Sequence, residues 1–395
     1  MSTSAAPATR APALWWALLV GNFVIGCGVM VVAGALNDIV RDLDVSVAVG
    51  GQLVAVSAIV LGVGAPLIAA LVGRWDRRRL LVGSLLWYGA GHALAALMPS
   101  YAALLPVRAL GVLSAAAFTP QAAAALSVML PPAERGRAIT FVFLGWSLAS
   151  VFGLPLASWI AGSFGWRWSF GFVAALTLPA AVWLARAMPA GVRPPPLSLA
   201  TWGRVFTHPA LMAIVAVTAL SAAGQFTLFS YFAPYYAQVL GASAAAGSAL
   251  FLVFGVFALA GNLLLTRHID RLGPGRCVAL GLGSIALSLL LWPLAGSVVA
   301  AAAVLVPWGL GCFSSNSAQQ ARLGQAAPAW AGALMALNTS AIYTGQAVGA
   351  AGGGALIALA GYVPLSWVGL AWVTAALGLS LWAGRRLTRQ PLPAP

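Results

Sequence analysis

One short charged stretch decides how this chain folds: Gly73-Arg74-Trp75-Asp76-Arg77-Arg78-Arg79. It holds one of only six acidic residues and four of the twenty arginines, and apolar segments too long for a soluble core helix flank it on both sides. A second charged stretch, from Arg267 to Arg276, carries Asp270, which follows Asp76 by 194 residues, about half of the 395-residue chain. A charged turn repeated at half-length between apolar helices predicts a membrane protein built from two related halves.

The composition requires a lipid environment for most of the chain. Charged residues make up 7% of it, against about 25% in a soluble domain, while hydrophobic residues make up 62% and the mean hydropathy is +0.96. A spanning helix needs about 20 apolar residues, so twelve such helices and their loops would use nearly all of the chain. The net charge of +14 does not predict a nucleic-acid partner, because the arginines are dispersed between apolar runs instead of forming a basic face.

The apolar segments fall into two sets of six. The first set is expected at 14–36, 47–71, 80–98, 101–128, 138–162 and 167–188, and the second at 209–235, 246–266, 277–295, 298–320, 331–357 and 364–384. Candidate kinks inside the spans are Pro66, Pro155, Pro234 and Pro307. We therefore expect an all-α integral membrane protein with an N-terminal bundle at 1–188, a proline-rich connector at 189–208 and a C-terminal bundle at 209–395.

The arginines predict the orientation. With the N-terminus inside, seventeen of the twenty arginines fall on the inner side, Arg41 and Arg167 fall outside, and Arg108 lies within the fourth span. This asymmetry predicts an even number of spans, with both termini and the connector in the cytoplasm.

The sequence contains no pattern typical of an enzyme or a metal site. Cys27, Cys277 and Cys312 are far apart and are expected to be buried packing residues, and the three histidines have no metal-ligand spacing. There is no P-loop, no HExxH and no pair of carboxylates, so we expect neither catalysis nor a cofactor, with coupling to a proton gradient left open.

Five motifs lie in order along the chain. They are the charged stretch 73–79; Arg108-Ala109-Leu110-Gly111 with Ala115 and Ala116; a run from Gly145 to Gly153-Leu154-Pro155; Gly165-Trp166-Arg167-Trp168-Ser169-Phe170; and the stretch from Phe226 to Tyr235. With these motifs the chain resembles the major facilitator superfamily, and within it the twelve-helix bacterial efflux permeases of the sugar-efflux and chloramphenicol-resistance type. The resemblance implies a monomer in the bacterial inner membrane.

Two departures from the family pattern matter. The charged stretch lacks a residue before the acid and the second glycine, and Val29 stands where many members of this branch carry an acid in the first helix. The resemblance nevertheless implies a conformational latch at the inner gate, with Asp76 capping a helix and ion pairs joining the two halves. The latch residues are Gly73, Asp76, Arg77, Asp270 and Arg271. The alternative is a positive cluster that only sets topology.

Arg108 is the least expected residue, because a charge inside a span costs about 2.5–3.5 kcal/mol. It should face a cavity or a partner, and Asp38, just past the outer end of the first span, is the acid expected nearby. We therefore predict an Asp38–Arg108 pair with Asp38 as the proton-responsive group. The alternative is an arginine that snorkels to the interface.

The resemblance implies a substrate cavity lined by helices one, four, seven and ten, with contributions from five, eight and eleven. Its candidate residues are polar or aromatic residues within those spans: Asn22, Phe23, Gln121, Trp146, Gln225, Phe229, Tyr231, Trp308, Asn316, Gln319, Asn338, Tyr343 and Gln346. For any one amide, a hydrogen bond between helices is an equal alternative, and for the aromatic residues the alternative is packing.

The expected function is secondary active export of a sugar-like or drug-like small molecule by alternating access, driven by proton antiport. Val29 supports an alternative, a proton-independent facilitator or importer of a polar or anionic solute. The expected partners are membrane lipid and the small-molecule substrate.

Overall fold

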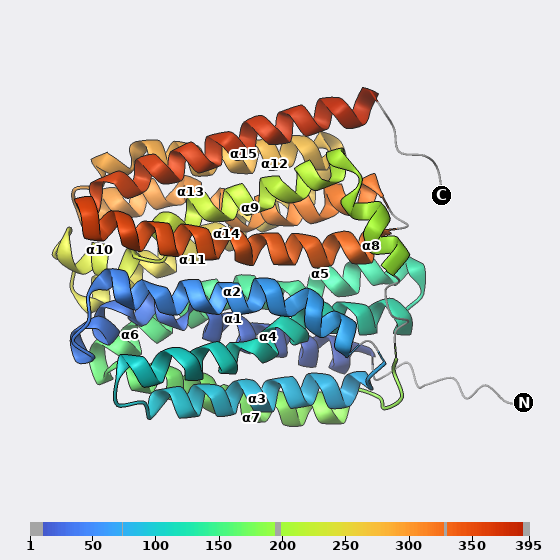
Figure 1. Cartoon of the computed structure of the whole chain (residues 1–395), viewed down its shortest axis with the longest axis horizontal. Coiled ribbons are helices and arrows are strands. Elements are labelled where there is room, and N and C mark those ends of the chain that lie inside the picture. The colour runs from blue at the N-terminus through green and yellow to red at the C-terminus, as the bar shows by residue number, and fades with distance from the viewer. Residues whose placement is uncertain (1–10, 73, 194–198, 328–329, 390–395) are drawn as a thin grey trace, which may run out of the picture.

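The computed structural model describes residues 11–72, 74–193, 199–327 and 330–389, which form helices and no strand. The helices of the first half are α1 (Ala11–Asp42), α2 (Val47–Leu71), α3 (Arg77–Ala96), α4 (Tyr101–Met129), α5 (Pro132–Leu148), η2 (Ala149–Gly153), α6 (Leu154–Phe164) and α7 (Trp166–Ala187). The rest are α8 (Leu199–Phe206), α9 (Pro209–Phe229), α10 (Phe232–Gln238), α11 (Ala244–Leu272), α12 (Pro274–Leu291), η3 (Trp292–Leu294), α13 (Val298–Ala326), α14 (Ala331–Ala360) and α15 (Val363–Arg389). The long helices lie side by side (Figure 1).

The predicted all-α membrane fold is confirmed. Within the described residues, eleven helical spans are long and apolar enough to cross a membrane. Helix α3, 20 residues long, packs between α4 and α7 and completes the predicted twelve, although its first turn carries three arginines. The short helix α8 lies in the predicted connector.

The two halves form separate sets of packed helices. Helix α1 packs on α5 and α7, and α3 on α4, whereas α13 packs on α11 and α12, and α9 on α14 and α15. In Figure 1 the blue-to-green half lies below the yellow-to-red half. The halves meet where α2 contacts α14, α6 contacts α11, and α1 contacts α10. The domain limits 1–188, 189–208 and 209–395 stay a prediction.

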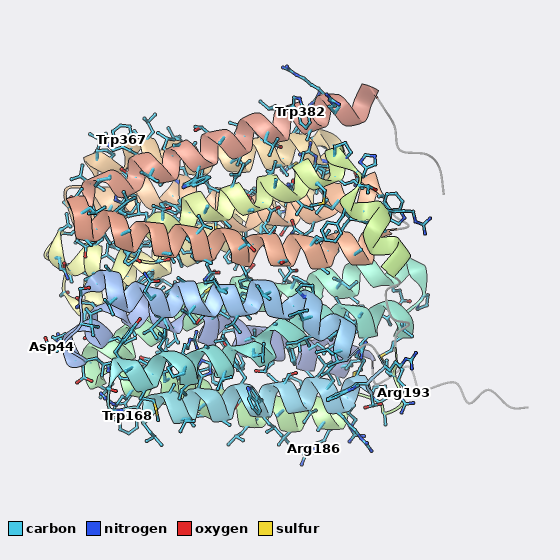
Figure 2. All side chains as sticks on the ribbon, viewed as in Figure 1. Asp44, Trp168, Arg186, Arg193, Trp367 and Trp382 are labelled. Carbon is cyan, nitrogen blue, oxygen red and sulfur yellow. The ribbon has the colours of Figure 1, made fainter. Side chains whose placement is uncertain are left out.

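The molecule has two unlike ends. Arg186 and Arg193 lie at one end, and Asp44 and Trp168 at the other (Figure 2). Helix α1 begins and α15 ends at the first end, which also carries the turns with Arg74–Arg79 and Arg267–Arg276. We call it the arginine-rich end, and the opposite one the Asp42 end. Which end faces the cytoplasm stays a prediction.

Two of the four predicted kinks interrupt regular α-helix. Proline has no N–H to donate to the carbonyl four residues back. Before Pro155 the helix widens into the π-turn η2, and before Pro234 it breaks at Ser230 and Tyr231, separating α9 from α10. Helices α2 and α13 run through Pro66 and Pro307 without ending.

Candidate functional site

A cavity of about 500 Å³ lies between the two halves. Residues from α1, α4, α5, α9, α11, α13 and α14 line it, as predicted for these helices, and α2 and α12 also contribute. Among the described lining residues there is no Asp, Glu, Arg or His.

The cavity reaches toward the arginine-rich end. Its lining includes Ile269 near the end of α11, Val278 near the start of α12, and Ala321 late in α13, all on that side. Toward the Asp42 end the lining stops at the level of Phe229 and Gln346. The cavity therefore opens in one direction and is closed in the other.

Tyr231, in the break between α9 and α10, forms the centre of the closed end. It is fully buried, and its hydroxyl donates a hydrogen bond to the carbonyl of Ala350 in α14. Gly51 of α2 lies so close that a Cβ there would be 2.0 Å from the Tyr231 hydroxyl oxygen, and Gly354 is similarly crowded. Only glycine permits this approach, which brings the N-terminal half against the C-terminal half.

An aromatic cluster packs around α10 behind this closure. The Phe232 ring stacks on Trp292 with 5.2 Å between ring centroids and 2° between planes, and it meets Trp308 edge-on. Tyr236 and Phe251 extend the cluster. Aromatic pairs in such geometries add stability beyond simple burial, so α10 is held firmly in place.

The structure places about half of the predicted cavity residues in the lining. Those in the wall are Trp146, Gln225, Phe229, Asn316, Gln319, Tyr343 and Gln346. Those outside it are Asn22, Phe23, Gln121, Tyr231, Trp308 and Asn338. Their predicted place in the cavity wall is thus corrected: Tyr231 and Trp308 belong to the closed end, and the others pack elsewhere.

The two asparagines outside the lining illustrate the physical reason. Asn22 donates to the carbonyl of Val142 and accepts from Thr119. Asn338 accepts from Thr218 at 2.6 Å and donates to Asn316 at 3.4 Å. An amide inside a membrane protein finds partners on neighbouring helices when it can, so these two join helices instead of facing the cavity.

Phe23 and Gln121 are turned away by helix geometry. Gly145 of α5 packs directly on the backbone of Phe23, at a level of α1 where the cavity does not reach the helix. In α4 the lining residues are Ala115, Ala116, Thr119 and Pro120. Gln121 is rotated by about 100° from Pro120 around the helix axis and therefore points away from the cavity.

Several lining residues were missed by the sequence analysis. They include Phe143, Thr218, Ser221, Phe226, Phe254, Asn262, Ser315 and Gln320, and also Cys312, which was expected to be buried packing. Helical spacing was the available signal, because Thr218, Ser221 and Gln225 recur every three to four residues and share one face of α9.

The predicted Asp38–Arg108 ion pair is wrong. Asp38 pairs with Arg41, three residues later in the same helix, at 2.6 Å. Arg108 instead donates from one guanidinium nitrogen to the carbonyl of Gly28 at 2.6 Å. Asp38 lies ten residues beyond Gly28 along α1, about 15 Å at the helical rise, and this separation places it beyond the reach of Arg108.

His92 is the second partner of Arg108. Its Nδ1 lies 2.8 Å from the carbonyl of Tyr88, so Nδ1 carries the proton of the neutral ring and donates it there. Its Nε2 then accepts from Arg108 at 2.9 Å. Arg108 and His92 are 2% and 1% exposed, and Phe170 lies against the guanidinium. In the described residues, no carboxylate pairs with this buried cation.

The charged stretch forms a compact turn tied to the connector. Asp76 is the N-cap of α3, accepting from the N–H of Arg79, and it also accepts from the N–H of Gly191. Partial burial favours the neutral carboxyl, but these N–H groups and the charge of Arg79 outweigh it, so the pKa of Asp76 lies below its usual range. The Arg77 side chain, 2% exposed, donates to the carbonyls of Val72 and Trp75.

The predicted latch between the halves stays a prediction. Gly73 and the side chain of Asp270 lie outside the described residues, and Arg271 is exposed in the last turn of α11. The ion pairs within the described residues, Asp38–Arg41 and Asp42–Arg167, both belong to the Asp42 end.

Comparison with known proteins adds the family. The model of the Major Facilitator Superfamily matches residues 18–350. The chain belongs to the major facilitator superfamily. It is therefore a multi-pass membrane transporter, and the predicted family is confirmed.

Bacterial efflux proteins are among its relatives. The chain is 32% identical over 260 residues to a chloramphenicol resistance protein of Streptomyces lividans, covering 64% of this chain and 66% of that protein. It is 28% identical over 357 residues to a probable sugar efflux transporter of Mannheimia succiniciproducens, covering 90% and 88%. Its fold matches the crystal structure of a D-xylose–proton symporter with a TM-score of 0.75 at 17% identity, covering 93% of this chain and 96% of that one.

Proposed function

We propose that this transporter exports a small neutral molecule by alternating access. The observation that carries the proposal is the cavity between the halves, open toward one end, closed at the other and free of charged side chains among its described residues. A charge in such a cavity would lack a compensating partner in a medium of low dielectric constant. The relatives named for efflux support the direction of transport.

Alternating access requires a second state that is closed at the arginine-rich end. In that state the turn at Asp76 and Arg77 meets the turn at Asp270 and Arg271, and their charges form the latch. The present state is closed at the Asp42 end by Tyr231 and by the close approach of Gly354 in α14 to Ala48 in α2. Rocking the halves exchanges one closure for the other.

We place the protein in a bacterial inner membrane with the arginine-rich end in the cytoplasm, as a monomer. The arginine distribution supports this orientation. The cavity then opens to the cytoplasm, where an exporter collects its substrate.

Proton antiport supplies the energy in this proposal. Since the described cavity wall carries no acid or histidine, the proton-responsive group lies behind the wall. Asp38, paired with Arg41, and His92, paired with Arg108, are the two candidates.

One observation favours a second candidate, a facilitator without proton coupling. Val29, which stands where many relatives of this branch carry an acid, faces the cavity. The valine side chain cannot bind or release a proton, so the acid that this branch places here is missing.

Flux in proteoliposomes with an imposed pH gradient tests the proposal. We expect a neutral compound to move against its gradient when protons move the opposite way, with internal pH and compound followed together. Asp38→Asn or His92→Gln should then uncouple the two fluxes. Compound flux that ignores the pH gradient in the wild type would establish the facilitator instead.

A further inference from the structure

The two walls of the cavity differ in chemistry. The wall from the N-terminal half is mainly apolar and aromatic, with Met30, Ala116, Phe143 and Trp146. The wall from the C-terminal half carries side-chain amides and hydroxyls on α9, α13 and α14, together with the rings of Phe226, Phe229, Phe254 and Phe313. A molecule between these walls meets most of the hydrogen-bonding groups on the side of the C-terminal half and apolar surface on both sides.

Gln346 is the most informative of the polar residues. It lies midway along α14, at the closed end of the cavity, and is only 4% exposed. Its amide makes no hydrogen bond to any residue that the structure describes, and its polar atoms are not among those sealed from the cavity. A buried amide without a partner is costly, so this side chain is arranged to receive a partner from within the cavity.

Gln225 faces the same closed end from α9. Its Nε2 donates weakly to Ser221, at 3.2 Å to the hydroxyl and 3.4 Å to the carbonyl. No described protein donor approaches its Oε1 within hydrogen-bonding distance. The two glutamines thus offer donors and acceptors together, which matches a hydroxyl or an amide group better than a charged one.

We propose that the substrate is neutral and amphipathic, with hydroxyl or amide groups bound by Gln346 and Gln225 and an apolar ring against Phe143 and Trp146. This inference rests on the proposed function, because it names the class of molecule that the transport cavity accepts. The C-terminal half then determines recognition of the polar edge, and the N-terminal half accepts the apolar face with little geometric demand. The C-terminal half therefore selects the polar groups of the substrate, and the N-terminal half accepts apolar groups of varied shape.

Binding to the purified full-length protein in detergent tests the inference separately from flux. The probe is phenyl β-D-glucoside, a neutral molecule that joins an apolar ring to hydroxyl groups. Its tetra-O-methyl ether keeps the ring and removes the hydroxyl donors, and phenyltrimethylammonium keeps the ring and adds a charge. Affinity is measured by isothermal titration for the wild type, Gln346→Leu and Gln225→Leu. Gln325→Leu is the matched control, because Gln325 is exposed near the end of α13 and outside the cavity wall.

We expect the glucoside to bind the wild type and Gln325→Leu equally, and to bind each of the other two variants about tenfold more weakly. The methyl ether should bind the wild type as weakly as the glucoside binds Gln346→Leu. Equal binding of the ether and the glucoside, preference for the charged probe, unchanged affinity in both cavity variants, or no binding of the glucoside would each overturn the inference. Flux in proteoliposomes tests the proposed function separately. A protein that binds the glucoside but transports no compound would confirm the binding site and contradict the proposed export.

Discussion

At the scale of the residue, Arg108 shows how a buried charge is stabilised without an acid. A carbonyl, an imidazole and an aromatic ring share its charge among α1, α3, α4 and α7. Gly28 makes this possible, because a Cβ there would lie 2.6 Å from the Nε2 of His92. The sequence identified Arg108 as unusual from its depth in the membrane. It could not identify His92, because depth does not say which side of a helix a residue occupies.

Replacing His92 should separate its structural role from its role as a proton acceptor. His92→Phe removes the acceptor and leaves a buried N–H of Arg108 unpaired, which should cost about 1–3 kcal/mol and lower the melting temperature in detergent. In His92→Gln the amide oxygen can accept in place of Nε2, so most of the stability should remain. A melting temperature that is the same for both variants would show that the bond to Arg108 contributes nothing.

Acid should distinguish the wild type from His92→Gln. A protonated imidazole has no lone pair for Arg108 and carries a second positive charge, so protonation must break the contact. The melting temperature of the wild type should therefore fall more on acidification than that of His92→Gln. Parallel pH curves would contradict a proton-responsive His92.

At the scale of the element, the sequence predicted the long helices well, but only two of the four predicted kinks interrupt a helix. Apolar runs between charged turns predicted the spans with limits that agree within about six residues, because lipid contact requires an apolar surface along the helix. The break at Tyr231 has a weak sequence signal in Pro234, since Pro66 and Pro307 leave their helices continuous. Whether a proline kinks a helix depends on neighbouring packing, which becomes visible only in the fold.

Asp76 should stabilise the start of α3 in a pH-dependent way. Asp76→Ala removes the cap, which is worth about 0.5–2 kcal/mol, together with the bond from Gly191. Because the pKa of Asp76 is lowered in the folded protein, its contribution is fully present above the ordinary aspartate pKa of about 3.9 and is lost as the pH falls through the lowered value. Asp76→Ala and the wild type should therefore differ at pH 7 and converge in strong acid, as followed by thermal unfolding. A constant difference at all pH values would contradict the assignment.

A larger residue at Gly51 should prevent closure at the Asp42 end. The Cβ of any replacement would overlap the hydroxyl of Tyr231, so Gly51→Leu must separate α2 from α10 and α14. We expect the cavity to become reachable from the Asp42 end, with loss of coupled transport. Labelling of Cys312 in the cavity wall by a membrane-impermeant maleimide measures this change. Gly171→Leu is the control, because a Cβ at Gly171 would have no neighbour within 4 Å.

At the scale of the whole molecule, the direction in which the cavity opens was beyond prediction from the sequence. The family resemblance implied a cavity and its lining helices, but the two states of an alternating-access protein have the same sequence and differ in free energy by only a few kcal/mol. The chemistry of the walls was predictable only in part, because a polar residue in a span faces either the cavity or another helix. In α14, Asn338 bonds to Thr218 of a neighbouring helix, whereas Gln346, eight residues later, lines the cavity.

Cys312 provides a natural probe of this direction. It lies in the cavity wall, whereas Cys27 and Cys277 are buried. The impermeant maleimide should label the wild type from the arginine-rich side and not from the Asp42 side, and Cys312→Ser should abolish the signal. Labelling from the Asp42 side alone would show that the resting state in the membrane is opposite to this structure.

The uncharged cavity also has an electrical consequence. Moving one elementary charge through a membrane potential of 100 mV involves about 2.3 kcal/mol, but a neutral substrate carried past the uncharged side chains of the described wall involves none. If this transporter is the proposed proton antiporter of a neutral molecule, voltage therefore acts on it only through the exchanged protons or through charged groups that move with the helices. A steady current recorded during the flux of a neutral substrate would consequently measure the movement of protons. Flux without any current would mean that the substrate moves down its own concentration gradient.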